Sequence, residues 1–155
     1  MSDIAFTAAD RRFMEAALEQ ARAAERVGEV PIGAVVVVDG RVLGASFNQP
    51  IGTRDPTAHA EVLALREAAR ARGNYRLAGA SVYVTAEPCL MCVGALVNAR
   101  VARVVYGVAE PKWGALRSLL RLEELRVNHR VEVAEGLLAD ECRRLLVEFF
   151  RSKRG

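Results

Sequence analysis

The fold is decided by residues 31–47, which read PIGAVVVVDGRVLGASF. Residues 31–38 are too rich in β-branched side chains to form anything but a strand, and Asp39-Gly40 is a tight-turn sequence. Residues 41–47 predict the returning strand. The sequence therefore predicts an antiparallel β-hairpin near the start of the chain.

The segments on both sides of this hairpin predict helices. Upstream, Thr7 followed three residues later by Asp10 is typical of a capped helix start, and apolar residues at helical spacing continue to Gly28. Downstream, Thr57 is a suitable cap for a second helix that ends at Gly73. The stretch between the hairpin and this second helix contains two prolines and predicts a loop.

From there the chain alternates strands with helices. We expect strands at residues 81–86, 101–106 and 131–133. We expect a helix after Pro88, a short helix at residues 116–125 and a final helix at residues 139–150. Strands separated by helices of this length are joined by parallel crossovers. The sequence therefore predicts an α/β fold with a mixed sheet. We find no repeat and no linker, so we expect residues 1–155 to form a single domain.

The composition fits one domain and limits the kinds of partner. The chain has 155 residues, 52% of them apolar, and 22 Lys and Arg against 19 Asp and Glu, a net charge of +3. This small charge excludes a strongly basic protein that coats nucleic acid. Residues 1–110 hold 12 basic and 12 acidic side chains, whereas residues 111–155 hold 10 and 7, so the surplus lies in the last third of the chain.

The sequence shows no sign of export or membrane insertion. No apolar stretch approaches the roughly 20 residues that cross a bilayer, and residues 1–4 lack the basic segment of a secretion signal. The chain has three cysteines, a number that is too small, and is odd, for a framework of disulfide pairs. We therefore expect a cytoplasmic protein without a membrane partner, in which a close cysteine pair serves metal or redox chemistry.

Two short motifs carry the candidate chemistry, His59-Ala60-Glu61 at the start of one predicted helix and Pro88-Cys89-Leu90-Met91-Cys92 at the start of the next. Cysteines three apart in a first helical turn lie on one face, where free amides and the positive helix end stabilise thiolates. One imidazole and two thiolates can hold Zn²⁺ and leave its fourth position open, which is typical of a catalytic site. His129 and Cys142 lack the spacing of a further ligand.

Glu61 indicates what such a site would do. It follows His59 by two residues, about 200° around a helix, so we do not expect it to bind the same ion. A neutral imidazole and two thiolates already balance the charge of zinc, whereas a carboxylate beside them can move protons. Zinc lowers the pKa of a water molecule toward neutrality, so Glu61 can take a proton from it. The hydroxide that results can attack an electron-poor carbon.

Two other interpretations of the cysteine pair remain open from the residues alone. A Cys-x-x-Cys at a helix start can be a redox pair, although such a pair needs no matching His-x-Glu motif. A structural zinc site needs a fourth Cys or His, which the sequence does not place. The occurrence of both motifs, with 26 residues between them, favours a catalytic zinc site.

The paired motifs resemble the signature of the zinc-dependent nucleoside and nucleobase deaminases. Further stretches are similar to the bacterial tRNA-specific adenosine deaminases, namely residues 30–34, 55–61, 74–77 and 128–132. The likeness covers about residues 6–154. It implies a three-layer α/β/α, cytidine-deaminase-like fold with a central mixed five-stranded sheet, a homodimer, and conversion of adenosine to inosine at the wobble position of a tRNA anticodon.

The resemblance also implies roles for individual residues. His59, Cys89 and Cys92 would bind one Zn²⁺ per subunit, and Glu61 would carry a proton from water to the purine ring and then to the leaving amine. Asn48 would hydrogen-bond the flipped nucleoside, helped by the backbone amide of Ala60. From its position alone, Asn48 is better explained as a turn-forming residue, and it is the family resemblance that favours a binding role.

Contacts to the anticodon loop of a tRNA, expected to be an arginine tRNA, follow from the same resemblance. Relatives usually carry Asp and Lys where this chain has Glu110 and Lys112, so the reach of Glu110 to the neighbouring nucleotide differs while Lys112 can still meet phosphate. Trp113 can stack on a base or pack on the protein's own surface. The C-terminal segment contains Phe149, Phe150, Arg151 and Arg154. These residues predict either binding of single-stranded RNA or a plain amphipathic helix with a solvated tail.

Two other functions compete with a tRNA deaminase. A small-molecule deaminase acting on guanine, cytidine or a pteridine-like ring would use the same chemistry, but it has no need of a basic, aromatic C-terminal segment. A non-catalytic, zinc-stabilised RNA-binding protein has no use for Glu61. The sequence therefore favours a zinc-dependent hydrolase that deaminates adenosine in RNA.

Overall fold

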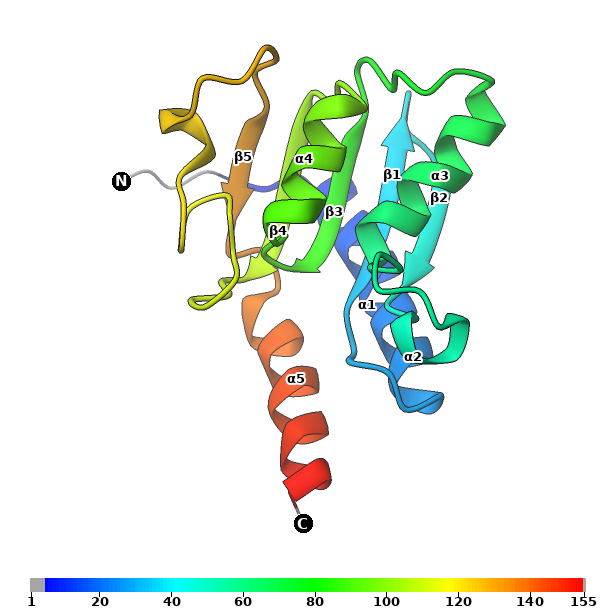
Figure 1. Ribbon diagram of the computed structural model, residues 1–155, viewed down its shortest axis with the longest axis vertical. Helices are drawn as coiled ribbons and strands as arrows, with labels where there is room; N and C mark the ends of the chain where they lie inside the picture. The colour runs from blue at the N-terminus through cyan, green and yellow to red at the C-terminus, as the bar shows by residue number, and fades with distance from the viewer. Residues whose placement is uncertain (1–4, 155) are drawn as a thin grey trace.

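The computed structural model describes residues 5–154 of the chain, and a mixed β-sheet lies at the centre of this part (Figure 1). The strands are β1 (Gly33–Val38), β2 (Arg41–Phe47), β3 (Ser81–Ala86), β4 (Arg103–Val108) and β5 (Glu132–Glu135). The helices are α1 (Ala8–Arg26), α2 (Pro50–Thr53), α3 (Ala60–Arg72), α4 (Leu90–Asn98) and α5 (Ala139–Arg154). A 3₁₀ turn, η1 (Leu122–Glu124), lies between β4 and β5.

The order of the strands is β2-β1-β3-β4-β5. Strand β1 is antiparallel to both β2 and β3, whereas the β3–β4 and β4–β5 pairs are parallel. The turn between β1 and β2 has positive φ at both Asp39 and Gly40, as a two-residue hairpin of matching twist requires. The predicted hairpin, the parallel crossovers and the α/β class with a mixed five-stranded sheet are confirmed.

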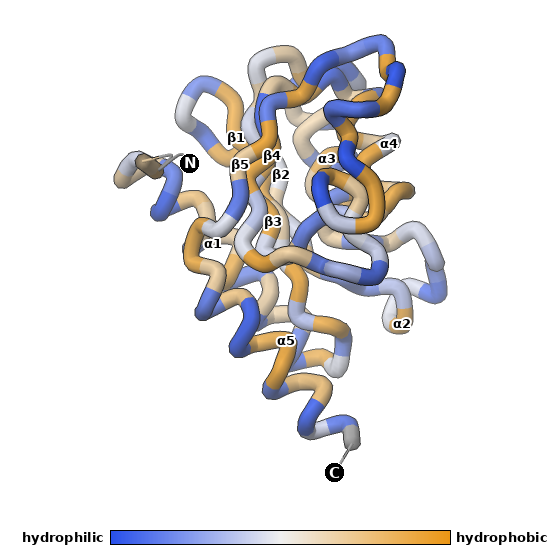
Figure 2. The backbone as a smooth tube through the Cα atoms, turned by 90° about the vertical axis from the view of Figure 1, so that its left-hand side faces the viewer, coloured by the Kyte–Doolittle hydropathy of each residue, from blue (hydrophilic) through white to orange (hydrophobic). Residues whose placement is uncertain are grey.

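Helices cover both faces of this sheet. Helices α1 and α5 pack on one face, and α3 and α4 pack on the other (Figures 1 and 2). Alternate strand residues feed the two apolar clusters, with Val36, Val82 and Val104 toward α3 and α4 and Val35, Tyr83 and Val105 toward α1 and α5. The described helices include none that is long and apolar enough to cross a bilayer.

Several element boundaries differ from the predicted ones. Helix α3 begins at Ala60 with His59 as its N-cap, two residues later than the predicted cap Thr57, because Thr57 donates its N–H and its hydroxyl to Asp55 in a tight turn. Strands β4 and β5 extend two residues further than predicted at their carboxyl ends. The later helix start matters for function, because it places His59 at a helix terminus.

The predicted short helix over residues 116–125 is wrong, since only η1 forms there. Leucines at helical spacing suggested it, but the segment is an irregular loop in which Leu116 and Leu122 are buried and Leu119 is exposed. The backbone amides of residues 116–118 all donate to the buried carboxylate of Glu87 instead of to a preceding turn. A tertiary acceptor thus overrides the local pattern.

A buried ion pair ties α1 to the sheet. Asp10 is 5% exposed and accepts hydrogen bonds from the Thr7 amide at 3.0 Å, the Tyr83 hydroxyl at 2.7 Å and the Arg103 guanidinium at 2.9 Å. Although burial opposes ionisation, the hydrogen bonds from Arg103, Tyr83 and Thr7 hold the pKa of Asp10 well below its usual range. The same burial, together with Asp10, raises the pKa of Tyr83.

We expect Asp10→Asn to lower the free energy of unfolding by about 2 kcal/mol at pH 7, because it removes the charge that Arg103 and Tyr83 solvate. Since the pKa of Asp10 is lowered on folding, its contribution is fully present above the unfolded value near 3.9 and is lost as the pH falls below it. Urea unfolding at pH 7 and pH 3 measures both quantities. A difference that grows on acidification would contradict the assignment.

Candidate active site and metal centre

Two helix N-termini meet at one end of the sheet. His59 is the N-cap of α3 and Cys89 is the N-cap of α4, and both helices lie on the same face of the sheet. Neither cap makes a side-chain hydrogen bond to its own helix, so both side chains are free for another use. The positive ends of two helix dipoles therefore lie beside the cysteine sulfurs, which favours their thiolate forms.

The donor atoms of His59, Cys89 and Cys92 all lie within 4.8 Å of one another. His59 Nδ1 is 3.6 Å from Cys89 Sγ and 3.4 Å from Cys92 Sγ. A tetrahedral zinc ion with bonds of about 2.3 Å to sulfur and about 2.0–2.1 Å to nitrogen separates such atoms by about 3.6 Å. The side chains are thus already spaced to hold zinc, with three protein ligands and one open position.

The proton equilibria of the three side chains in this cluster depend on one another. A hydrogen bond from Cys92, and a second one from His59, lower the pKa of Cys89 to about 4 against the opposing effect of burial. The thiolate of Cys89 in turn raises the pKa of His59. The neighbouring Cys89 and burial raise the pKa of Cys92, so these two sulfurs share one proton until a cation displaces it.

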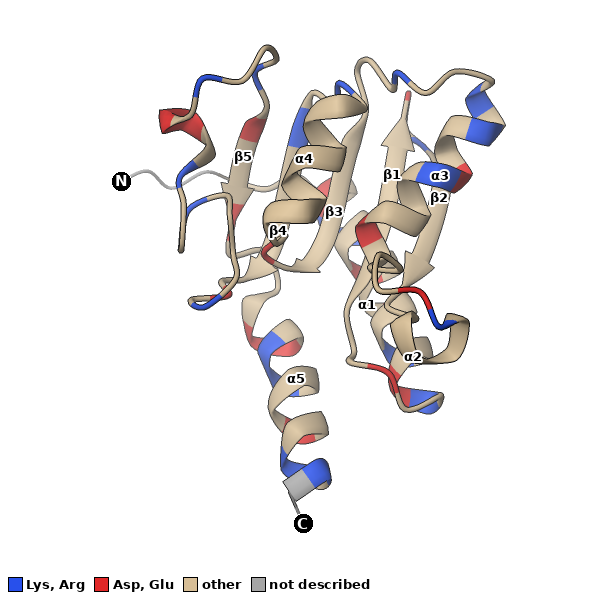
Figure 3. Ribbon diagram, viewed as in Figure 1, with Lys and Arg blue, Asp and Glu red and all other residues tan. Residues whose placement is uncertain are grey.

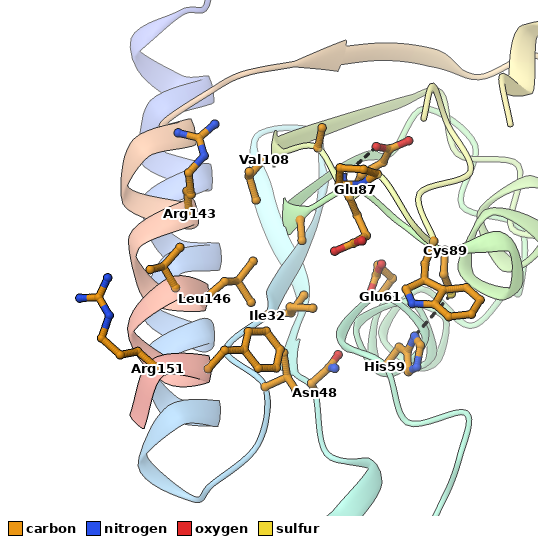
Figure 4. A pocket seen from close by; sticks show the side chains of 18 residues that line it. Ile32, Asn48, His59, Glu61, Glu87, Cys89, Val108, Arg143, Leu146 and Arg151 are labelled. Carbon is orange, nitrogen blue, oxygen red and sulfur yellow. Dashed lines mark hydrogen bonds between the residues drawn. The ribbon is translucent and has the colours of Figure 1, made fainter. Parts of the chain in front are cut away.

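Glu61 lies in the first turn of α3 and is 4% exposed. Its carboxylate does not belong to the three-ligand cluster, but both Glu61 and His59 line the same cavity (Figure 4). Burial raises the pKa of Glu61 to about 7. A carboxyl group with a pKa near neutrality can both accept and return a proton, as a general acid–base requires.

Asn48 and the Ala60 amide, both predicted to contact the nucleoside, are hydrogen-bonded to each other. The Ala60 N–H donates to Asn48 Oδ1 at 2.9 Å, and Asn48 is 7% exposed. This bond fixes the orientation of the Asn48 amide, because the oxygen is committed to the helix terminus. The amide NH₂ group of Asn48 is therefore the donor that the cavity offers to a ligand (Figure 4).

A cavity of about 1060 Å³ connects these groups to α5. Its polar end contains Asn48, His59, Glu61 and Cys89, and its other wall consists of apolar and basic side chains of α5 (Figure 4). The wall from α5 is formed by Arg143, Leu146, Val147, Phe150 and Arg151. This volume lies slightly above the range of small-molecule sites, about 300–1,000 Å³.

The C-terminal residues predicted to grip RNA have different surroundings. Phe150 is 45% exposed and lines the cavity together with Arg151. Phe149 is only 7% exposed, with Lys153 above its ring, so the prediction that it stacks on RNA bases is corrected. The side chain of Arg154 lies outside the described residues. Figure 3 shows both acidic and basic residues on α5, with basic ones toward its C-terminal end.

The loop after β4 brings its predicted residues to the mouth of the cavity. Glu110 and Trp113 both line it, and Trp113 is 67% exposed. Glu110 Oε1 accepts the backbone N–H of Lys112 at 3.1 Å, which holds the turn between them. Lys112 is exposed and does not line the cavity. Trp113 thus faces the cavity instead of packing into the core.

Glu87, which belongs to neither sequence motif and was not predicted as a site residue, lines the cavity and is 4% exposed. Although burial opposes ionisation, hydrogen bonds from the Ser118 hydroxyl and from surrounding backbone amides lower the pKa of Glu87. Its position gave a signal, because a charged residue at the carboxyl end of a parallel strand commonly faces a site. His129 and Cys142 lie elsewhere, with His129 bonded to the Val101 carbonyl and Cys142 buried beneath Gly107.

Comparisons with known proteins agree with this site. A family model described as MafB19-like deaminase matches residues 8–154. The chain is 45% identical to the tRNA-specific adenosine deaminases of Haemophilus influenzae, over 94% of this chain and 85% of that protein, and of Bacillus subtilis, over 94% and 91%. A structure solved in a study of A-to-I editing by tRNA A34 deaminases at the wobble position of transfer RNA matches with a TM-score of 0.85 and 46% identity, over 87% of this chain and 99% of that one. The chain therefore belongs to the MafB19-like deaminase family and groups with the tRNA-specific adenosine deaminases.

Proposed function

We propose that this protein is a hydrolase that converts adenosine to inosine, with release of ammonia, at the wobble position of a tRNA anticodon. The composition of the site supports this activity in addition to the family comparison. The site combines a three-ligand His-Cys-Cys cluster, a buried carboxylate outside that cluster, and a cavity large enough for more than a free base. A structural metal site would need neither the carboxylate nor the cavity.

The donor set and its spacing fit zinc, which we propose as the cofactor, one ion per subunit. His59, Cys89 and Cys92 would hold it, since imidazole and thiolate are the ligands that zinc favours and their separations match a tetrahedron. When bound there, zinc supplies Lewis acidity that lowers the pKa of a water molecule toward neutrality. The remaining chemistry is assigned to the chain's own residues.

Glu61 is proposed as the proton carrier. Its carboxylate takes one proton from the attacking water and delivers it to the purine ring nitrogen while the water oxygen bonds to the ring carbon. It then takes the second proton of that water and delivers it to the amine, so that the carbon–nitrogen bond breaks, ammonia leaves and the oxygen remains as the carbonyl of inosine. Burial of Glu61 keeps bulk water from competing for that proton. Asn48, held by Ala60, would donate its amide hydrogen to the flipped base and orient the carbon that is attacked.

RNA contacts are proposed for the two walls of the cavity mouth. Trp113 on one wall and Phe150 on the other are both partly exposed, and aromatic side chains stack on bases without a strict sequence preference. Lys112 and Arg151 lie beside them and can meet phosphate. Glu110 would contact the nucleotide next to the target through its second carboxylate oxygen, because the first is committed to Lys112.

The test is a deamination assay with the zinc-loaded protein. Substrates are the anticodon stem-loop of an arginine tRNA, the same stem-loop with guanosine at the wobble position, and free adenosine, guanine and cytidine. Inosine from the first RNA alone, with equimolar ammonia, is the expected result. Turnover of a free base or nucleoside at comparable kcat/KM would indicate a small-molecule deaminase, and binding of RNA without turnover would indicate a non-catalytic protein.

A homodimer is also part of the proposal, with α4 at its centre. Leu90 is 58% exposed and Met91 is 38% exposed, although both are apolar residues in the first turn of a helix. Gly94 continues this exposed face one turn later, and a Cβ added there meets nothing within 4 Å. An uncovered apolar helix face with a small residue at its centre is typical of a surface that another subunit covers.

We expect Gly94→Arg to raise the dissociation constant of the dimer by at least about 30-fold, because it places a charge in the centre of the covered face. The added side chain meets no atom of its own subunit, and Arg is the better helix former, so the monomer stays folded. Analytical ultracentrifugation measures the change. Ala71→Arg, at an exposed position of α3, is the matched control and should remain dimeric. A dimeric Gly94→Arg protein would exclude this face.

We further propose that residues 1–155 form one catalytic domain in the cytoplasm. A single sheet with an apolar cluster on each face accounts for the described core, which supports one domain. All three cysteines are free thiols, and a zinc site with two thiolates needs a reducing compartment to stay intact. An arginine tRNA is the proposed substrate, and the assay above tests it against other anticodon stem-loops with a wobble adenosine.

A further inference from the structure

Glu87 is a buried carboxylate whose hydrogen-bonding capacity is fully used. It follows β3 directly and stands two residues before Cys89. Its two oxygens accept from five donors, the backbone N–H groups of Glu110, Leu116, Arg117 and Ser118 and the Ser118 hydroxyl. A carboxylate offers about four lone-pair sites. No acceptor site is therefore left for substrate, which separates Glu87 from the proton carrier Glu61.

The five donors belong to one irregular segment, residues 110–118. The segment forms neither helix nor strand, so its buried amides need an acceptor from elsewhere in the fold. Glu87 supplies one at both ends of the segment, with N···O distances of 3.1 Å to Glu110 and 2.8 Å to Arg117. Hydrogen bonds to a charged acceptor are about twice as strong as neutral ones. This one side chain thus fixes the path of the whole loop.

The middle of the loop is tightly closed around Glu87. A Cβ added at Gly114 would lie 2.3 Å from Glu87 Cδ, so only glycine allows this approach. Gly114 also forms an isolated antiparallel bridge with Cys89, and the Ala115 N–H donates to the Pro88 carbonyl at 2.8 Å. The loop is therefore attached to the segment that carries a metal ligand.

This loop forms one wall of the cavity mouth. Glu110, Pro111 and Trp113 line the same cavity as Cys89. Figure 4 shows Cys89 on the side of the cavity opposite Arg143, Leu146 and Arg151 of α5. Trp113 is 67% exposed, so little packing of its own ring holds it in place. Its position depends on the backbone of the loop, and hence on Glu87.

We propose that Glu87 is a positioning residue for recognition of the RNA, which holds Glu110 and Trp113 where they meet the nucleotides that flank the target base. The inference rests on the proposed function for its substrate. Glu87 acts through the loop and leaves the groups that react with the base unchanged. Its loss should therefore weaken substrate binding far more than the chemical step.

The test is Glu87→Gln, which keeps the shape of the side chain. Whichever oxygen becomes the amide nitrogen, at least two of the five donors lose their acceptor and face another donor. We expect KM for the anticodon stem-loop to rise by at least about tenfold, the effect of losing one charged hydrogen bond, while kcat stays within about threefold. Bound zinc should remain near one per subunit.

A spectroscopic measurement reports on the loop without substrate. Trp113 is the only tryptophan of the chain, so its fluorescence anisotropy reports directly on the mobility of this loop. We expect the anisotropy to fall in Glu87→Gln. Ser118→Ala, which removes only one of the donors, should give a smaller fall in the same direction and serves if Glu87→Gln does not fold.

Glu29→Gln is the matched control. Glu29 is also a buried carboxylate that accepts backbone amides, but those of Ile51 and Gly52 at the start of α2. The anisotropy of Trp113 should be unchanged in this variant. An unchanged anisotropy in Glu87→Gln, an unchanged KM, or loss of zinc would each overturn the proposal. If the wild-type protein does not deaminate RNA, the proposed function fails, while the anisotropy still decides whether Glu87 holds the loop.

Discussion

Glu61→Gln is expected to lower kcat by about 10²- to 10⁴-fold while the protein keeps one zinc ion per subunit, because the substitution removes the proton carrier and no metal ligand. The amide has almost the same volume as the carboxyl group, so the buried site does not collapse. KM for RNA should change little, since the contacts of Asn48 and of the cavity mouth remain. Single-turnover kinetics and metal analysis of the same preparation measure both parts.

The matched control lies on the same helix. Glu67 of α3 is exposed, accepts the backbone N–H of Ala45 at 3.1 Å and does not line the cavity. Glu67→Gln should keep kcat within about twofold, since surface changes of this kind cost little. Loss of zinc from Glu61→Gln would show that Glu61 is a ligand and that its assigned role is wrong.

Cys92→Ala is expected to abolish zinc binding and to lower turnover by more than about 10³-fold, since Lewis acidity contributes several kcal/mol to such reactions. Cys92 is fully buried and only 3.4 Å from His59 Nδ1, so its replacement removes one of the three ligands from the interior of the site. Helix α4, which carries it, packs on the sheet through the buried side chains of Val93, Leu96 and Val97. We therefore expect the circular dichroism of the variant to be unchanged.

Cys142→Ala provides the same chemical change at a second buried cysteine. Cys142 lies in α5 beneath Gly107, outside the three-ligand cluster. This variant should keep its zinc and its activity, and lose about 1 kcal/mol of stability from the cavity that the sulfur leaves. Loss of zinc from Cys142→Ala, or its retention in Cys92→Ala, would contradict the ligand assignment.

The parts of the site that could be predicted are those determined by local spacing. His59 and Glu61 two residues apart, and Cys89 and Cys92 three apart, lie at the starts of helices that the sequence itself marks. The hairpin was equally local, because Asp39 and Gly40 accept the positive φ values that its turn requires. In each case the deciding interaction spans fewer than about five residues along the chain.

The parts that could not be predicted depend on contacts between distant segments. Glu87 shapes a loop that begins 23 residues later, and its hydrogen bonds replace the helix that the leucines near residue 120 suggested. Phe149 and Phe150 are neighbours of the same type, yet the turn of α5 buries the first and exposes the second. Composition alone assigns both to the same role, because it carries no information about which face of a helix meets the sheet.

The outer strand β5 affects the tendency of the protein to aggregate through the edge of its sheet. Strand β5 has only four residues, and Glu132 and Glu135 at its ends pair with Arg103 and Arg117 within the molecule. A second copy that added its own β5 antiparallel to this edge would bring carboxylates together at the ends of a very short ladder. The charges thus act against edge-to-edge growth into fibrils. The dimer proposed for the apolar face of α4 would instead end with a closed pair of subunits.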